Sequence, residues 1–296
     1  MAANSVAVAD AAVAVQPRRR PTLMRRIRRY PLPALGALLL VLLVASALGA
    51  PWIAAHDPFE MNVVDRLQPP NEEYWFGTDS FGRDMFSRTL HGGRISLLIG
   101  IAVATASTVL GLVIGVIAGY FRLADAILMR IMDGLMAIPG ILLAIALMSL
   151  TRASVWVVIV AITIPEIPRV VRLVRAVVLT VREQVYIEAA TAIGTRFPRL
   201  MLKHILPNTL APLIVQATYI AASAVLVESY LSFLGVGTPP EVPSWGNIIA
   251  EGRLYVQIAF WNILFPSVFL GLMVLSINIL GDGLRDMLDP RLARRL

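Results

Sequence analysis

Few side chains of this sequence are suited to catalysis or to binding a metal ion. It contains no cysteine, and its three histidines, His56, His91 and His204, are widely separated along the chain. They form neither an HExxH helix nor a closely spaced set of ligands. The GxSxG turn that carries the nucleophile of serine hydrolases is also missing. We therefore expect no catalytic residue and no metal site in this chain.

The single lysine argues against nucleotide binding by this chain. Lys203 follows Leu202, whereas the phosphate-binding loop of nucleotide hydrolases requires a Gly-Lys-Ser or Gly-Lys-Thr sequence. We expect no cofactor here. If the activity of the protein depends on ATP and Mg, partner chains must bind them.

Ionisable side chains inside long apolar segments are the other candidates, because such groups are costly in lipid and often mark substrate or ion pathways. Arg130 and Asp133 are three residues apart in LMRIMDGLM. On a helix they share a face and can form an ion pair. They lie either near the inner end of a membrane span or along a pathway.

Three arginines recur at every third position, as in a voltage-sensing helix: Arg169, Arg172 and Arg175. This leaves a voltage-dependent channel subunit as a remote alternative. Pro165 and Pro168 precede the stripe, and no pore-loop filter such as TVGYG is present. We expect these arginines at the inner end of a span, either solvated or paired with Glu183 or a partner protein.

Two more polar residues lie within apolar runs, Glu228 in VLVESYLSFLG and Asn278 in INILGDG. The Glu228 carboxylate could face a central cavity or lie at the membrane interface. Asn278 could line the same pathway or form a hydrogen bond between helices.

Composition indicates that these residues are positioned by membrane-spanning helices. The chain has 296 residues, of which 57% are hydrophobic and 15% are charged, and its mean hydropathy is +0.74. Runs of about 20 apolar residues are long enough to cross a bilayer as helices. We predict an all-α membrane protein with six transmembrane helices, at residues 31–54, 95–119, 126–150, 154–178, 209–231 and 262–281.

The positions of the arginines orient these spans. Although the net charge is +7, the basic residues flank apolar segments and form no single face, so they do not indicate nucleic-acid binding. We place the basic N-terminal tail (1–30), the loop at 183–208 and the C-terminal tail (285–296) in the cytoplasm. The acidic linker at 55–94 faces outward, and the five-helix core covers residues 95–284.

Two outward segments are rich in glycine, proline or aromatic residues. The stretch WFGTDSFGRDMFSRTLHGGRISL (75–97) has aromatic residues typical of a membrane interface, and its glycines predict short pieces with an interfacial helix. The stretch GVGTPPEVPSWGNII (235–249) cannot form a regular spanning helix. We expect it to be a loop that dips into the protein.

The inner loop EAATAIGTRFPRLMLKHILPN (188–208) has the pattern of two short helices. Glu188, Ala189 and Ala190 end the first helix, and Gly194 lets the chain reverse. On the second, an apolar stripe includes Phe197, and Leu206 and Pro207 begin the next span. The small alanines allow another backbone to approach, so the loop is suited to docking or is simply a solvated surface loop.

The EAA sequence, followed after three residues by Gly194 and later by Leu206 and Pro207, resembles the cytoplasmic loop of permeases of bacterial ATP-binding-cassette importers. The family's usual isoleucine is replaced here by His204. FGTDSFGRDMFSR, LSFLGVGTPPEVPSWG and INILGDGLRDMLDPR are similar to segments of C-type permeases of dipeptide, oligopeptide and nickel importers. These segments occur in the family's order and cover the chain from about residue 25 to its end.

The resemblance implies the fold of a type I importer permease, in which the EAA loop docks on an ATPase subunit. The expected partners are a second, similar permease, two ATPase subunits and an external substrate-binding protein. The expected location is the inner membrane of a bacterium, with both termini cytoplasmic, and transport proceeds by alternating access. Peptides are the expected cargo, with nickel or another small solute as the alternative.

Overall fold

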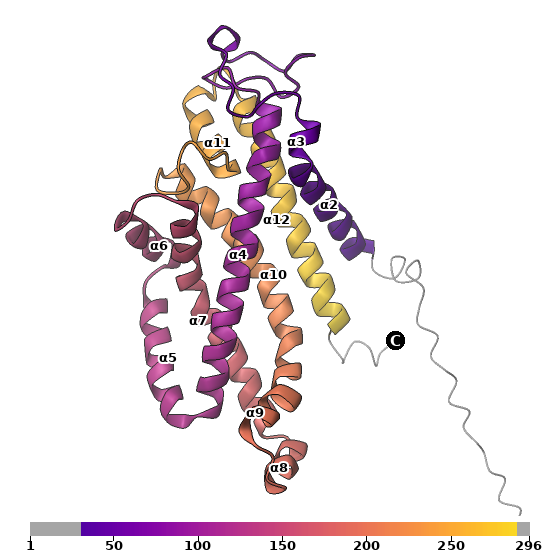
Figure 1. Ribbon diagram of the computed structural model, residues 1–296, viewed down its shortest axis with the longest axis vertical. Coiled ribbons are helices and arrows are strands. Elements are labelled where there is room, and N and C mark those ends of the chain that lie inside the picture. Colours follow the sequence, from indigo (N-terminus) through magenta and orange to yellow (C-terminus); the bar gives the residue numbers. More distant parts are fainter. Residues whose placement is uncertain (1–30, 289–296) are drawn as a thin grey trace, which may run out of the picture.

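A computed structural model describes residues 31–288, which form helices joined by loops. The predicted N-terminal tail and residues 289–296 of the predicted C-terminal tail lie outside the described part. Figure 1 shows the helices running mainly along the long axis of the molecule. The helices, in order, are α2 (Pro31–Leu48), α3 (Ala50–Ile53), η1 (Val63–Asp65), α4 (Met85–Tyr120), α5 (Arg122–Ala137), α6 (Gly140–Ser149), α7 (Val155–Arg182), α8 (Val185–Ala192), α9 (Phe197–Leu200), η2 (Met201–Ile205), α10 (Leu206–Phe233), α11 (Trp245–Gly252), η3 (Arg253–Tyr255) and α12 (Trp261–Leu288).

Each predicted span coincides with helical structure, but two spans differ from the simple expectation. The helices α2, α4 and α12, and the continuous helix Phe197–Phe233, are long and apolar enough to cross a membrane. The predicted span at 126–150 is broken, because α5 and α6 meet at an angle of 87°. Ile138 and Pro139 are extended at the break, as expected where a proline disfavours helical geometry in the preceding residue. The prediction of one uninterrupted span at 126–150 was wrong.

The second deviation is α7, which has 28 residues and so the length of a span. Among the described helices of 18 residues or more, α7 is the one without a long stretch that is both apolar and poor in charged residues. Glu166 and four arginines lie within it. Proline at positions 165 and 168 also interrupts its backbone hydrogen bonds.

Close contact between α4 and α7 holds the centre of the molecule together. Gly111, Gly115 and Gly119 lie at four-residue intervals on α4, facing valines of α7. A Cβ atom on Gly115 would lie 2.7 Å from Cβ of Val174, and one on Gly119 would lie 2.7 Å from Cβ of Val178. Small residues at this spacing let two membrane helices approach closely. The sequence analysis did not identify this contact.

The predicted interfacial helix before the second span does not form as a separate piece. The linker is irregular apart from η1, and α4 begins at Met85, where the Asp84 side chain accepts hydrogen bonds from the backbone amides of Phe86 and Ser87. Such a cap starts a helix efficiently. Gly92 and Gly93 lie within α4 and do not break it. Their lack of side chains leaves room for Trp245. The linker and residues 234–260 together form what we call the cap (54–84 and 234–260).

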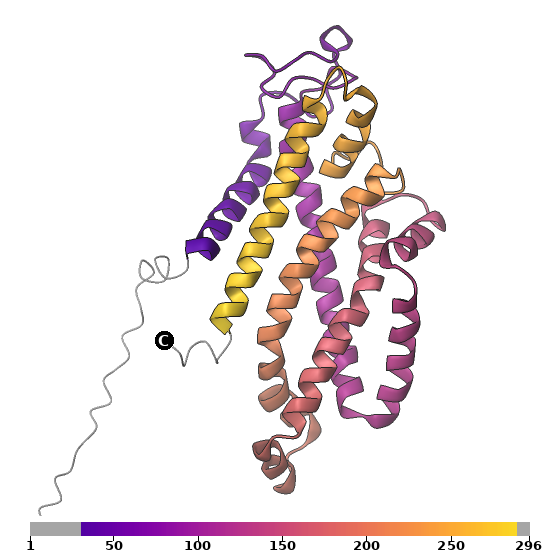
Figure 2. The same cartoon turned by 180° about the vertical axis from the view of Figure 1, so that it is seen from behind.

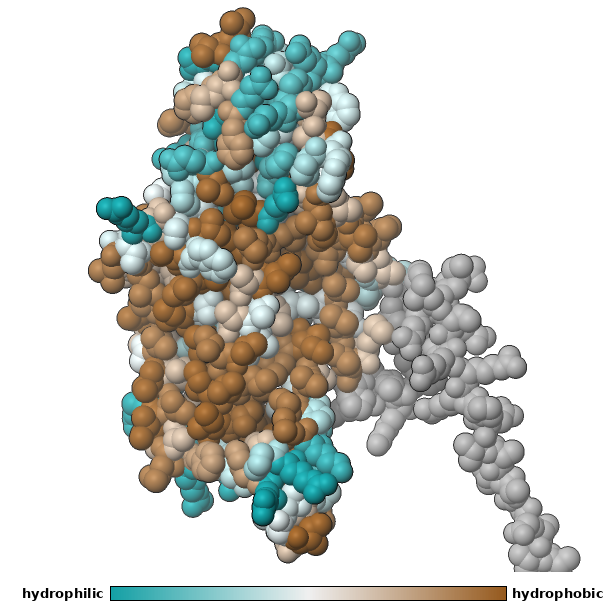
Figure 3. Space-filling view, in the orientation of Figure 1, coloured by the Kyte–Doolittle hydropathy of each residue, from teal (hydrophilic) through white to brown (hydrophobic). Residues whose placement is uncertain are grey.

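The surface has three zones along the long axis. Figure 3 shows a broad hydrophobic band between a polar upper end, formed by the cap, and a polar lower end, where α8 and α9 lie. We call the lower part the loop end (183–208). Seen from behind, α12, α10, α7 and α5 follow one another across the molecule, with α4 on the far side (Figure 2). The hydrophobic band is the expected contact with lipid.

Candidate functional site: the loop end, a charged face and the cap

The loop end is a small folded unit with its own apolar core. Ile187 of α8, Leu200 of α9 and Ile205 of η2 are each no more than 2% exposed, and Ala190 and Met201 are also buried. These side chains continue the core between α7 and α10. The loop is therefore a rigid extension of two long helices, as a docking element requires.

Gly194 ends α8 in the manner predicted. Its φ angle is +78°, a left-handed conformation that glycine adopts without steric cost. The amide of Thr195 donates to the carbonyl of Ala190 at 3.1 Å, and the amide of Gly194 donates to that of Thr191 at 2.9 Å. This pair of hydrogen bonds is the Schellman motif, which satisfies the last carbonyls of a helix.

The polar surface of the loop end also exposes large apolar side chains. Val185 is 79% exposed, Ile193 is 84% exposed and Leu202 is 67% exposed. Glu188 and Ala189 are also exposed, whereas Ala190 points into the loop's core. Only one of the two alanines is thus available to a partner. Exposed apolar side chains outside the hydrophobic band are typical of a protein interface.

The remaining predicted coupling residues attach the loop to the span helices. Phe197 packs edge-to-face on Tyr120, with ring centroids 4.6 Å apart, and so connects the loop to the end of α4. Leu206 is half-buried and Pro207 is exposed in the first turn of α10. Proline is favoured there because its missing amide hydrogen needs no partner. Before it, η2 is a short π-helix, a local irregularity common at functional sites.

A row of ion pairs runs along α7 toward the loop end. Arg169 pairs with Glu166 at 3.2 Å, Arg172 with Asp133 at 2.6 Å, and the Arg175 Nη2 atom lies 2.7 Å from Asp125. We call these six residues the charge ladder. Asp133 therefore pairs with Arg172 of α7 and does not pair with Arg130. Of the alternatives for the arginine stripe, the pairing with Glu183 does not occur within residues 31–288. Asp125 and Asp133 come from α5, whereas Glu166 lies on α7 itself.

A groove lies beside the ladder at the loop end of α7, α10 and α12. Its volume is about 620 Å³. Its polar lining residues are Asn208, Gln216, Tyr219 and Arg285. Tyr219 also donates a hydrogen bond to Asp282 of α12 at 2.5 Å. Asn278, predicted as a pathway or inter-helix residue, is half-buried one turn before Asp282.

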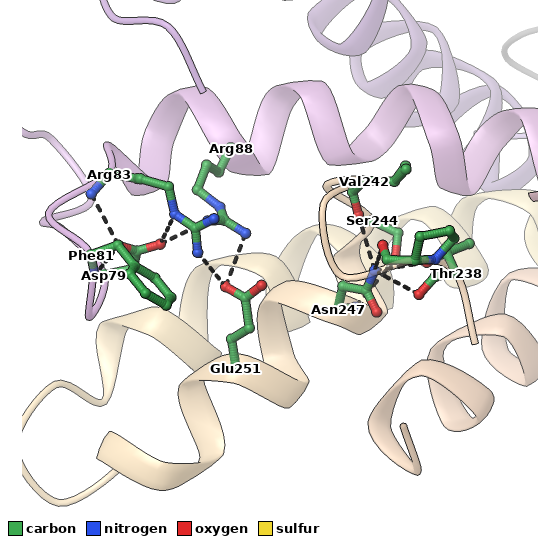
Figure 4. A network of polar contacts seen from close by, with 10 residues as sticks. Asp79, Phe81, Arg83, Arg88, Thr238, Val242, Ser244, Asn247 and Glu251 are labelled. Atoms are coloured by element: carbon green, nitrogen blue, oxygen red, sulfur yellow. Dashed lines mark hydrogen bonds and ion pairs between the residues drawn. The ribbon is translucent and has the colours of Figure 1, made fainter. Parts of the chain in front are cut away.

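Glu228 lies near the end of α10, next to the cap, and its side chain is completely buried. Its Oε1 atom accepts hydrogen bonds from the hydroxyls of Ser232 at 2.8 Å, Thr238 at 3.3 Å and Ser244 at 2.7 Å. The Glu228 side chain is thus neither at an interface nor exposed to a cavity, contrary to both sequence-based alternatives. It ties the buried Pro/Gly loop, which dips into the protein as predicted, to α10. Asn247 of α11 completes the cluster by donating to Thr238, Pro239 and Val242 (Figure 4).

A second polar cluster of the cap joins the linker and α4 to α11. Arg83 and Arg88 both contact Asp79 and Glu251, and Figure 4 shows their guanidinium groups pointing toward Glu251. Burial raises the pKa of Glu251 to about 7, although Arg83 favours the ionised form. The motif GTDSFGRDMFSR contains three of these residues, but sequence spacing does not reveal Glu251 as their partner.

The described residues offer no metal centre. Within 31–288, no group of three or more histidine, cysteine, aspartate or glutamate side chains could hold an ion together. The features of the site among these residues are a folded loop with exposed apolar side chains, paired charges and a groove.

These features match a known family of membrane proteins. A family model described as "Binding-protein-dependent transport system inner membrane component" matches residues 111–294, well over half of the chain. The chain belongs to this family. A second model, the N-terminal TM domain of oligopeptide transport permease C, matches residues 22–70. The resemblance to C-type permeases is thereby confirmed, and the chain is an inner-membrane component of a transport system.

Similar proteins carry the names of peptide permeases. The chain is 52% identical over 274 residues to a probable peptide ABC transporter permease protein of Sinorhizobium fredii, covering 93% of this chain and 94% of that protein. It is 40% identical over 290 residues to the dipeptide transport system permease protein DppC of Alkalihalophilus pseudofirmus, covering 98% and 95%. The remote alternative of a voltage-dependent channel subunit is not supported by these matches.

A solved structure shares the fold. The inward-facing MetNI methionine ABC transporter aligns with a TM-score of 0.58 and 23% identity, covering 69% of this chain and 98% of that chain. This likeness confirms the predicted all-α architecture of an importer permease.

Proposed function

We propose that this chain is one of two permease subunits of an ATP-driven importer that moves dipeptides or oligopeptides across the inner membrane of a bacterium. The chain's own part is to form a passage, while two partner ATPase subunits bind ATP and Mg. An external substrate-binding protein delivers the peptide. The names of the relatives support the cargo, and nickel or another small solute is the alternative.

The observation that carries this proposal is the exposed apolar surface of a rigid loop end. Val185, Ile193 and Leu202 are exposed on the loop end, which lies below the hydrophobic band of the molecule (Figure 3). Because the loop shares a core with α7 and α10, a partner that moves the loop also moves these helices. Glu188 and Ala189 are the contact positions, Gly194 fixes the turn after α8, and Phe197, Leu206 and Pro207 transmit the movement. Ala190 positions α8 from within.

The orientation follows from the same assignment. The loop end faces the cytoplasm, where ATP is available, and the cap faces outward, where the binding protein docks. Both termini are then cytoplasmic, because an even number of spans separates them. Alternating access arises when ATP-driven closure of the ATPase pair pushes the loop and biases a two-state helix bundle by a few kcal/mol.

The predicted pathway residues receive different roles. Asp133 and Arg130 remain pathway candidates because both are exposed on α5. Asn278, half-buried on α12, also remains a candidate. Glu228 is reassigned to holding the cap together, since its side chain is fully buried.

The docking claim can be tested by cross-linking in this cysteine-free chain. Ala189→Cys and Ile193→Cys variants, with cysteines on the ATPase surface, should form disulfides whose yield changes with nucleotide. Val64→Cys, in the cap and 86% exposed, is the matched control and should give none. If neither loop variant cross-links under any nucleotide condition, the loop is not the coupling element.

A further inference from the structure

The charge ladder lies at a depth where charges are expensive. The ladder residues belong to α5 and α7, which lie at the level of the hydrophobic band (Figures 1 and 3). The side chains are well exposed: Arg169 is 57%, Arg172 is 44% and Asp133 is 54% exposed. Arg175 and Asp125 are 31% and 25% exposed. Pairing lowers the cost of such charges in hydrocarbon but leaves their remaining hydrogen-bonding groups unsatisfied.

Other exposed positions along the band are apolar. On α4 they include Leu98, Ile101, Val109, Leu110 and Val113, and on α2 they include Leu35, Leu38, Val41 and Leu42. Figure 3 shows this apolar character over the α4 side of the molecule. The contrast indicates that α4 and α2 meet lipid, whereas the face formed by α5 and α7 meets water or a polar partner.

A groove with several polar lining residues lies on the α10 side of α7. It is lined by Leu173 of α7, by residues of α10 and by Arg285 of α12. These helices follow one another across the rear of the molecule (Figure 2). The ladder itself thus forms a polar strip between α5 and α7, and the groove lies on the side of α7 that faces α10.

We propose that the charge ladder is the wall of a water-filled passage, and that its ion pairs bind the charged ends of a peptide in turn. This inference rests on the proposed function and adds the residues that touch the cargo. The partner across the passage is the second permease subunit. The cargo class is a zwitterion, with one ammonium group and one carboxylate.

The chemistry of the ladder suits such a cargo. The Arg172–Asp133 and Arg175–Asp125 pairs each offer a guanidinium for the peptide carboxylate and a carboxylate for the peptide ammonium group. The third pair offers only the guanidinium of Arg169, because the Glu166 side chain is 9% exposed. Successive arginines are three residues apart, which corresponds to a rise of about 4.5 Å on a helix. An extended dipeptide spans about 7 Å, so its two ends can reach different ion pairs. The peptide would exchange one ion pair for the next and would not bind too tightly at any one of them, because the protein's own ion pair reforms after the peptide leaves.

Arg130 adds a further positive charge on α5. It is exposed on α5 and forms no ion pair with any residue in the range 31–288. With Arg130, four arginines face three carboxylates on this strip. The excess positive charge favours the carboxylate end of a peptide.

Accessibility of introduced cysteines tests the proposal in the assembled complex. Ala126 and Ala176 are exposed and share the helix faces of the ladder, since Ala126 is seven residues before Asp133 and Ala176 is four after Arg172. In native membrane vesicles, Ala126→Cys and Ala176→Cys should react with a charged methanethiosulfonate reagent. A saturating dipeptide should slow the reaction several-fold. Val113→Cys and Leu110→Cys on α4 are the lipid-facing controls and should not react.

A second measurement separates contact with the cargo from a structural role. Arg172→Gln should slow uptake of a peptide with a free carboxylate but leave uptake of the same peptide with an amidated carboxylate unchanged. A purely structural arginine would affect both peptides equally. Exchanging the pair, as Arg172→Asp with Asp133→Arg, should recover most of the uptake lost in either single variant.

The outcomes distinguish this inference from the proposed function. If the vesicles take up peptide but Ala126→Cys and Ala176→Cys react only with an uncharged, membrane-permeant reagent, the ladder does not face water and the inference fails. Equal effects of Arg172→Gln on both peptides would also overturn it. If the wild-type complex takes up no peptide with ATP, the proposed function itself fails.

Discussion

The Arg83 guanidinium lies 2.6 Å from the Glu251 carboxylate, although 168 residues separate them in the chain. Arg88 shares the same carboxylate at 3.0 Å. Through this contact the first outward segment holds α11, and α11 in turn holds the buried loop at Thr238 and Ser244. The cap is therefore one connected unit, and Glu251 of α11 is the acidic side chain that joins its two segments by ion pairs.

The protonation of Glu251 should make the stability of the cap depend on pH. Burial raises its pKa to about 7, from an ordinary value of 4.5. A carboxyl group with a raised pKa binds its proton more tightly in the folded state. Its contribution to stability is therefore fully present below pH 4.5 and is lost as pH rises through about 7. The advantage of the wild type over Glu251→Gln should fall by about 2 kcal/mol from about pH 5 to about pH 8.

This prediction is checked by unfolding both proteins in detergent across that pH range. Glutamine cannot titrate, so effects of other groups cancel in the difference. A difference that is constant with pH would contradict the assignment.

Gly115 should tolerate no side chain, because its missing Cβ would lie 2.7 Å from Cβ of Val174. Gly115→Val forces α4 and α7 apart and should destabilise the protein by about 1–3 kcal/mol. The matched control is Gly134→Ala in α5, where no atom lies within 4 Å of the added Cβ. This change should stabilise the helix by up to about 1 kcal/mol. Thermal unfolding in detergent measures both, and equal effects of the two changes would be inconsistent with a close α4–α7 contact.

Gly194 should matter through its backbone alone, since its surroundings are open. At a φ angle of +78°, an alanine costs about 1–2 kcal/mol. Hydrogen exchange of the α8 amides in Gly194→Ala should accelerate by roughly tenfold. Asparagine tolerates this conformation better, so Gly194→Asn should show a smaller acceleration. Unchanged exchange in both variants would mean that the Schellman motif does not hold α8.

Glu228 should be structural and should not contact cargo. Glu228→Gln keeps an oxygen that accepts from Ser232, Thr238 and Ser244, so it should cost less than about 1 kcal/mol and leave peptide uptake unchanged. Glu228→Leu leaves the three buried hydroxyls without this acceptor and should cost at least about 2 kcal/mol. Thermal unfolding and uptake at several peptide concentrations test both. Lower uptake in a stable Glu228→Gln variant would return this residue to the pathway.

Local sequence signals predicted the features that depend on neighbouring residues. Hydropathy located the spans, and the EAA pattern located a loop whose turn at Gly194 has the expected positive φ. The break at Pro139 was missed because hydropathy remains high on both sides of it. The Ala137–Gly140 segment nevertheless contains the signal, since a Pro-Gly pair is a common site of chain reversal.

Long-range partners were beyond the sequence analysis. Asp133 has an arginine three residues away in sequence, yet it pairs with Arg172, which is 39 residues away. Glu251 meets Arg83 only because α11 folds back on α4. The choice among several possible partners is made by helix packing, here by the glycines that bring α4 and α7 together, and one sequence does not specify that geometry.

The most direct test of the central claim is uptake of a labelled dipeptide by cells that lack the gene for this chain. Returning the wild-type gene should restore energy-dependent uptake, whereas the Gly194→Trp variant, present in the membrane at the same level, should restore little because its loop end cannot dock. If the wild-type gene restores no peptide uptake, the chain is not a peptide permease. If Gly194→Trp restores uptake fully, the loop end does not couple the chain to its ATPase partners.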